Sequence, residues 1–205
     1  EDAGGPITVA SSNNITITNA ISWDSGSTLT LQTTTPGSTI NINAGITDSY
    51  SGAGGLTIQA AIPTVRISTA CYCTINVANF NLEQAAWLQL VNDGSNSGNI
   101  PATVVNSVTT YVLPSFAATN DFEVNQTGAT FLRATGGNGG GETPYSLVDI
   151  YGVQGVQGFL NSNFTLNNGY ISASGTSTWN DGQGFASIGS EDAPFQGSKR
   201  HLPAG

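Results

Sequence analysis

The segment NITITNAI at residues 14–21 returns as TININAGI at residues 39–46, a spacing of 25 residues. Apolar and polar residues alternate in both copies, which is the pattern of a β-strand with one buried face. The segment LTL at residues 29–31 likewise returns as LTI at residues 56–58, so two residues have been inserted between the copies. Short strands repeated every roughly 20 to 50 residues indicate a solenoid, in which each unit buries its apolar side chains against the next.

Further strand signals continue along the chain. Runs of β-branched and aromatic residues, separated by turns rich in Gly and Ser, occur at 75–77, 104–113, 129–132, 147–151 and 164–171. A short helix competes with a strand only at 81–90, and the sequence has no obvious amphipathic helix that would cover an end of a solenoid.

We therefore predict an all-β fold, namely a right-handed parallel β-helix (β-solenoid) of roughly eight coils that is irregular in its second half. In this prediction residues 1–197 form a single β-solenoid domain. Regular repeats occupy residues 1–77, irregular coils with loops occupy 78–197, and residues 198–205 form a tail.

Composition limits the classes of function. The 205 residues include 13 acidic and 4 basic ones, for a net charge of −9, and only 8% of residues are charged. With 38% hydrophobic residues the chain can form a core, which argues against disorder. The negative charge would repel nucleic acid and anionic membranes, and there is no run of about 18 apolar residues that could cross a membrane. No basic segment followed by an apolar one begins the sequence, so we expect that any secretion signal has been removed or lies outside this sequence.

Longer motifs carry a resemblance to a known family. The run NITITNAISWDSGSTLTLQ resembles the repeats of filamentous-haemagglutinin-type large exoproteins, the passenger proteins of two-partner secretion in Gram-negative bacteria. The second half is similar to the block that precedes GLUG-type repeats in the same proteins, through the segments at 80–90, 113–124, 129–157, 163–189 and 194–197. The resemblance implies a secreted cell-surface β-solenoid, either part of a long adhesive fibre or a self-stacking filament subunit. The tail SKRHLPAG departs from the family, which has glycine-rich repeats there.

Catalysis is the main alternative to a structural role. Polysaccharide lyases and hydrolases need a pair of carboxylates or a basic residue beside the bound sugar. Asp121 and Glu123 share one strand face, but no catalytic motif surrounds any acid, and Arg66 and Arg133 are the only bases before the tail. We predict that the protein is not an enzyme. A polysaccharide-degrading β-helix enzyme and a carbohydrate-binding module stay open as alternatives.

Arg133 is the basic residue most in need of a partner. It lies in the FLRA motif of a region with few charges, so we expect an acidic partner, and Asp121 and Asp149 are the candidates. We favour a structural ion pair over ligand recognition for this residue.

Metal and thiol chemistry have weaker signals. Asp181 and Asp192 lie in oxygen-rich turns that could hold Ca²⁺, but no calcium-loop motif surrounds them, so simple Asx-turns are favoured and no cofactor is expected. Cys71 and Cys73 point to the same side of an extended strand, about 7 Å apart, which is too far for a mutual disulfide without a kink. We interpret both as buried or edge thiols with a structural role.

The ends of a solenoid suggest how it would assemble. Each end exposes unpaired strand edges, and Ile7, Thr8 and Val9 could add as a strand to a neighbour. We therefore expect a homo-oligomer stacked end to end, or contact with neighbouring modules of a longer fibre. The predicted function is attachment to host or environmental glycans and surfaces, without nucleic acid and without membrane insertion.

Overall fold

Strands dominate the structure, which is a computed structural model that describes residues 5–60, 65–68, 73–125, 128–167, 169–197 and 199–200. About 41% of residues are in strands and 9% in helices, so the predicted all-β class is confirmed. None of the helices in these ranges is long and apolar enough to cross a membrane.

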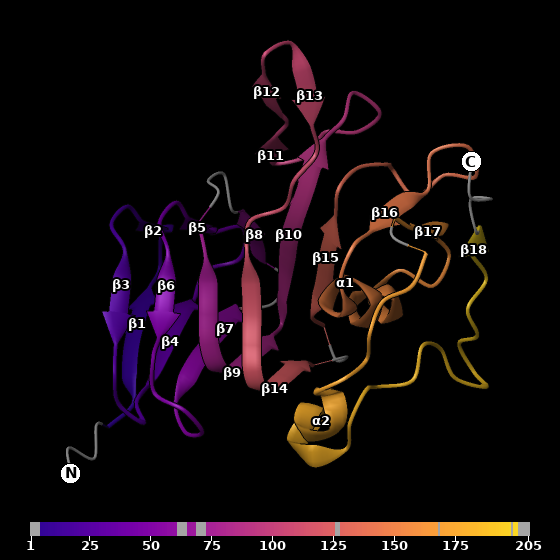
Figure 1. Ribbon diagram of the computed structural model, residues 1–205. Coiled ribbons are helices and arrows are strands. Elements are labelled where there is room, and N and C mark those ends of the chain that lie inside the picture. The colour runs from indigo at the N-terminus through magenta and orange to yellow at the C-terminus, as the bar shows by residue number, and fades with distance from the viewer. Residues whose placement is uncertain are drawn as a thin grey trace.

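Parallel strands stack in three rows, which curl around a common interior (Figure 1). The first row contains β1 (Ile7–Ser11), β4 (Thr28–Thr33), β7 (Gly55–Ala60), β9 (Ile75–Glu83) and β14 (Phe116–Val124). The second row contains β2 (Ile15–Ile17), β5 (Ile40–Ile42), β8 (Val65–Ser68), β10 (Ala85–Asn92) and β15 (Thr130–Ala134). The third row contains β3 (Ile21–Trp23) and β6 (Ile46–Asp48), followed by the first halves of β9 and β14.

The predicted repeat register is confirmed. Ile15 lies opposite Ile40 in the second row, and Leu29 lies opposite Leu56 in the first. Side chains reinforce the same alignment: the backbone N–H of Thr39 donates to Asn14 Oδ1, 25 residues away, at 2.8 Å. Each unit is thus built on the next by matching apolar and polar positions.

The number of stacked levels is smaller than predicted. No row in the described ranges contains more than five strands, compared with the roughly eight coils expected from chain length. Part of the chain leaves the rows after β10 and forms β11 (Ile100–Pro101) and an antiparallel hairpin of β12 (Thr103–Val105) and β13 (Val108–Thr110). The chain after β15 forms β16 (Tyr145–Leu147), β17 (Phe164–Leu166), β18 (Lys199–Arg200) and short helices.

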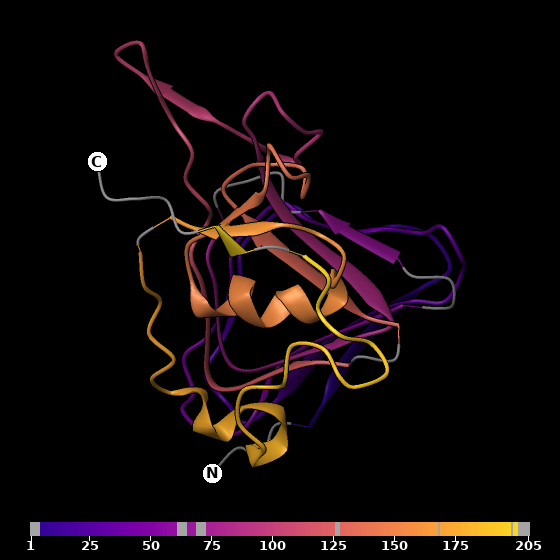
Figure 2. The same cartoon turned by 90° about the vertical axis from the view of Figure 1, so that its right-hand side faces the viewer.

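A short helix covers the end of the rows next to β15, which corrects the expectation that no capping helix exists. Helix α1 (Ile150–Gly155) and the 3₁₀ turn Val156–Gly158 lie across that end, as Figure 2 shows. Of the predicted strand at 147–151 only Leu147 lies in a strand, because β16 ends there. The Asp149 carboxylate accepts a hydrogen bond from Gly152 N at 2.9 Å and starts the helix. Conversely, the segment 81–90 belongs to strands β9 and β10, not to a helix.

The interior changes in character along the rows. Near β1 to β7 the core consists of aliphatic side chains such as Leu31, Ile40 and Ile58. Near β14 and β15 it consists of aromatic rings in edge-to-face and stacked contact, among them Phe80, Trp87, Phe116, Phe122 and Phe131. Trp179, from helix α2 (Trp179–Gly182), packs on Phe122 and on Tyr151 of α1 at ring-centroid distances of 5.0 and 5.1 Å.

Candidate functional site

Arg133 belongs to β15 of the second row, and its side chain is buried where helix α1 packs against that strand. Its Nε donates to Asp149 Oδ2 at 2.6 Å, its Nη1 to Gln89 Oε1 at 2.8 Å and its Nη2 to the carbonyl oxygen of Pro114 at 2.9 Å. The guanidinium also lies 5.7 Å from the centre of the Phe116 ring. The expectation of an acidic partner is confirmed, and the partner is Asp149. With all three of these nitrogens already bonded inside the protein, the guanidinium is arranged to hold α1 on the rows.

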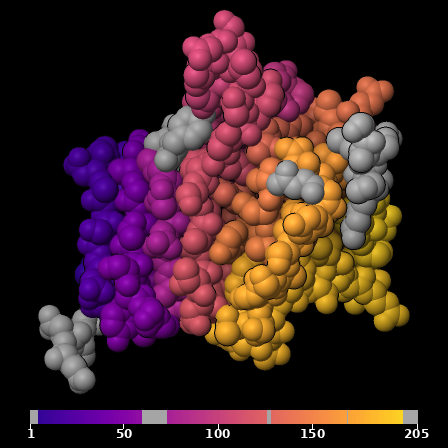
Figure 3. All heavy atoms as spheres, in the orientation of Figure 1, coloured from indigo at the N-terminus to yellow at the C-terminus, as the bar shows by residue number. Residues whose placement is uncertain are grey.

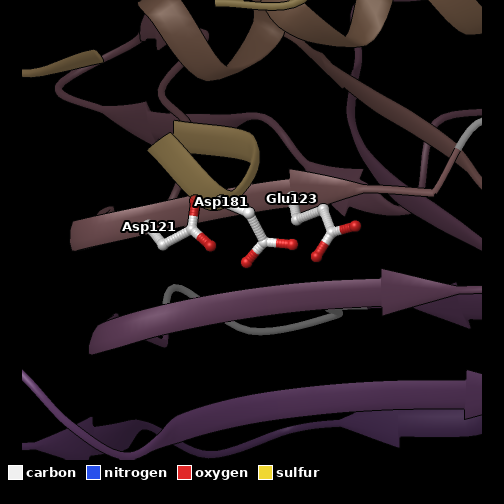
Figure 4. A group of neighbouring side chains, drawn as sticks. All are labelled: Asp121, Glu123 and Asp181. Atoms are coloured by element: carbon white, nitrogen blue, oxygen red, sulfur yellow. The ribbon is translucent and has the colours of Figure 1, made fainter. Parts of the chain in front are cut away.

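Three carboxylates converge where α2 lies beside β14, and we call Asp121, Glu123 and Asp181 the carboxylate cluster (Figure 4). Asp121 and Glu123 project from the same face of β14, because side chains two apart in a strand point the same way. Asp181 comes from α2, where Asn180 and Asp181 have positive φ angles of 53° and 56°. One ligand oxygen from each residue lies within 4.8 Å of the others.

Burial and repulsion by neighbouring negative charges raise the pKa of two members of this cluster, Asp121 and Glu123. Burial raises the pKa of Asp121 above its ordinary value, although backbone N–H groups of α2 partly oppose the shift. Burial also raises the pKa of Glu123, and the negative charges of Asp181, Asp121 and Glu83 add to it. Asp121 Oδ1 is buried without a hydrogen-bond partner. Such a group can share a proton among its oxygens, or offer them to a hard cation such as Ca²⁺.

The structure separates the two calcium candidates taken from the sequence. Asp181 belongs to the carboxylate cluster, whereas Asp192 is exposed in a loop and is not part of it. Sequence reasoning placed Asp121 and Glu123 on one strand face but did not connect them with Asp181. Strand periodicity does not predict the positive φ angles of a turn, so no sequence pattern indicated that Asp181 would join Asp121 and Glu123.

The hairpin β12–β13 stands out from the body and exposes apolar side chains. Figure 3 shows it as a projection above the stacked rows. Asn106 and Ser107 form its two-residue turn, with φ angles of 50° and 64°. The exposed large hydrophobic residues of this segment are Val104, Val105, Val108, Tyr111 and Val112. No charged residue occurs between positions 94 and 120.

A groove of about 320 Å³ lies beside this segment and is lined by Tyr111, Asp93 and Asn167, among others. Asp93 holds the two loops of the groove together, accepting hydrogen bonds from Gly137 N at 2.8 Å and from the Ser95 hydroxyl at 2.6 Å. Burial by itself would raise the pKa of Asp93, but these hydrogen bonds and the one from Ser95 N lower it below its ordinary value. An aromatic ring beside a carboxylate and an amide is a combination suited to sugar hydroxyls and ring faces.

The predicted assembly residues Ile7, Thr8 and Val9 form the first strand of the first row. All three are exposed, and β1 is paired with β4 on one side. Among the described residues, no strand pairs with its other side.

One cysteine can be placed. Cys73 is half-buried and takes part in a disulfide bond, so the expectation of a thiol at this position was wrong. The error came from assuming an extended strand, whereas Cys73 precedes β9 outside any strand. Cys71 lies outside the described residues.

In comparisons with known proteins, no family model matches the chain, and no curated protein or solved structure is significantly similar to it. The resemblance to filamentous-haemagglutinin-type exoproteins therefore stays a prediction.

Proposed function

We propose that the chain is a structural and adhesive module, a right-handed parallel β-helix that presents the hairpin β12–β13 for attachment at a cell surface. The three rows of parallel strands support the solenoid part of the proposal, because each row joins segments from successive repeats. We place the module outside the cell, and the disulfide at Cys73 supports this location, since disulfides persist in oxidising compartments.

The observation that carries the attachment role is the apolar, uncharged hairpin. Five of the ten exposed large hydrophobic residues found in the described ranges gather on residues 104–112. Exposed apolar patches on soluble proteins mark interaction sites, because burying them against a partner removes them from water. The hairpin projects from a stacked body, so a partner can reach both of its faces.

Attachment is tested with beads that carry the purified chain and are incubated with cultured cells. Replacing Val104, Val105 and Val108 by Thr keeps the β-branched shape but removes apolar surface. We expect bead adhesion to fall at least about tenfold, in line with the loss of burial of several methyl groups. The matched control Tyr170→Ser removes an exposed aromatic residue elsewhere and should leave adhesion unchanged. Equal adhesion of the hairpin variant and the wild type would refute the proposed role.

A second candidate function is carbohydrate recognition, which the groove beside Tyr111 favours. A glycan array with the wild type and Tyr111→Ala tests binding. A reducing-sugar assay on the bound glycans, repeated with Asp121→Asn, tests cleavage by the carboxylate cluster. Glycan binding lost in Tyr111→Ala without release of reducing sugar would indicate a binding module, and release that depends on Asp121 would indicate an enzyme.

A further inference from the structure

The outer face of the second row becomes apolar at β10 and β15. Side chains that point away from the interior occupy one column of this row, which runs from Thr16 in β2 and Asn41 in β5 to Leu88 in β10 and Leu132 in β15. Leu88 and Leu132 lie opposite each other and are only 8% and 6% exposed. They belong to a second apolar cluster, which they form with side chains of β16, β17 and the 3₁₀ turn after α1. The second row thus carries a core on each face at this level.

The second core is not completely filled, and a pocket of about 500 Å³ opens beside it. Leu88, Leu90 and Leu132 line the pocket from the strands. Tyr145 and Phe159 line it from the segments that cross the strands, and their ring centroids are 6.3 Å apart. Small-molecule sites in proteins have volumes of about 300–1,000 Å³ and mostly apolar linings, so the pocket has the size and the character of such a site.

The two amide side chains at the pocket are already engaged within the protein. Asn96 donates a hydrogen bond to Asp93 Oδ1 at 2.7 Å, and Asn138 donates one to the carbonyl oxygen of Ser95 at 3.3 Å. Tyr145, in contrast, is half-buried, and no described residue bonds to its hydroxyl. Burial raises the pKa of Tyr145, so this hydroxyl stays neutral. None of the described residues that line the pocket is charged.

This lining favours one class of ligand. A sugar would bring many hydroxyls into a site whose amides are engaged, and each buried polar group without a partner costs free energy. A charged group would lose its hydration without gaining an opposite charge from the described lining. An alkyl chain gains free energy when it leaves water for contact with leucine side chains. One oxygen atom at the end of the chain can bond to the Tyr145 hydroxyl, which both donates and accepts.

We propose that this pocket binds a neutral amphiphile, namely an alkyl chain that carries one hydroxyl or carbonyl group. The chain lies along the leucines of β10 and β15, and its oxygen bonds to the Tyr145 hydroxyl. Along β10 the pocket extends from Ala86 to Leu90, which is about 13 Å and gives room for several methylene groups. It shares no lining residue with the groove beside Tyr111. The proposal does not depend on the attachment role of the hairpin.

The test measures how n-alcohols displace the fluorescent apolar probe N-phenyl-1-naphthylamine from the purified chain. Each buried methylene should strengthen binding about fourfold, so the dissociation constant should fall by that factor per carbon from butanol to octanol, at one site per chain. Hexanoate, which is ionised at pH 7, should bind at least about tenfold more weakly than hexanol. A dissociation constant that does not change with chain length overturns the proposal, and so does equal binding of hexanol and hexanoate.

The variant Ala86→Phe tests where the ligand binds. Ala86 is half-buried and lines the pocket, so a phenyl ring at this position takes up space that the alkyl chain needs. We expect the dissociation constant of hexanol to rise at least about tenfold. The matched control Ala10→Phe makes the same change at an exposed position of β1 and should bind like the wild type. A folded Ala86→Phe variant that binds hexanol as tightly as the wild type would refute this site.

The variant Tyr145→Phe removes one hydroxyl and keeps the ring, so it gives a test even where Ala86→Phe does not fold. Hexanol should bind about two- to tenfold more weakly, which is the contribution of one hydrogen bond. Binding of 1-chlorohexane, which has no hydroxyl, should not change. Tyr170→Phe, at an exposed tyrosine elsewhere, should affect neither ligand. An equal loss for both ligands in Tyr145→Phe, or no loss for hexanol, contradicts the proposal.

The hairpin variant used to test attachment separates the two proposals. Its three substitutions lie on β12 and β13, outside the lining of the pocket, so it should bind hexanol like the wild type. A loss of hexanol binding in this variant would place the alcohol on the hairpin and overturn the assignment of the pocket. Adhesion and alcohol binding can therefore fail independently.

Discussion

Replacing Arg133 with Met should cost the protein a large part of its stability. The Arg133 side chain is 5% exposed and bonds to Asp149, Gln89 and Pro114, so the change leaves one carboxylate and two neutral oxygens without their donor. Breaking a buried pair from one side costs about 3–5 kcal/mol. Asp149 is 26% exposed and keeps its bond from Gly152 N, so we expect the lower value, about 3 kcal/mol.

The assay is thermal and urea unfolding followed by circular dichroism. For a chain of this length each kcal/mol corresponds to about 2–4 °C, so the melting temperature should fall by about 6–12 °C. Arg133→Lys keeps the charge but cannot reach three acceptors in different directions, and should lose an intermediate amount. The double variant with Asp149→Asn should be less destabilised than the sum of the single variants. A loss below about 1 kcal/mol for Arg133→Met would show that the guanidinium does not hold α1, because surface pairs are worth that little.

Three further predictions concern the carboxylate cluster and the end of the rows that α1 covers. Because folding raises the pKa of Asp121 and Glu123, the folded chain binds protons more readily, and the free energy of unfolding should fall as pH rises from their ordinary values of 3.8 and 4.5 through the raised ones. Urea titrations across this range should show a shallower fall when both are replaced by their amides, and an identical fall would contradict the raised values. Gly155→Ala should destabilise the chain by about 1–3 kcal/mol through its clash with β15, whereas Gly141→Ala, with open space around it, should have little effect in the same melts. Trp179→Ala should cost about 3–5 kcal/mol and increase the binding of a hydrophobic dye, since the indole covers the aromatic core; equal dye binding would count against that cover.

Strand alternation accounts for what could be predicted of the fold. Ile15 and Ile40 share a register because only that alignment buries both copies of the repeat, and the pattern is visible without a structure. Helix α1 was not predictable in the same way. Its sequence IYGVQG contains two glycines and two β-branched residues, which are weak helix formers. The helix exists because Asp149 caps it and because glycine permits close contact with β15, and both depend on the rest of the fold.

In the candidate site, too, strand periodicity predicts some features, whereas others depend on how distant parts of the chain pack. The shared face of Asp121 and Glu123 follows from the two-residue period of a strand and could be predicted. The position of Asp181 depends on a turn with positive φ angles far along the chain, which periodicity does not describe. Asp149 could be named as one of two partners for Arg133, but only the packing of α1 against β15 selects it over Asp121.

The shift from an aliphatic to an aromatic core gives the molecule a mechanical polarity. Each strand of a row touches only its neighbours, so opening spreads from a free end one level at a time. In a single molecule, a pull on the end next to β1 would peel away levels held by aliphatic contacts and backbone bonds. A pull on the end next to α1 would have to break the linked contacts of Phe122, Tyr151 and Trp179 together. The molecule would therefore unfold gradually when it is pulled at the end next to β1, and would unfold in one cooperative step when it is pulled at the end next to α1.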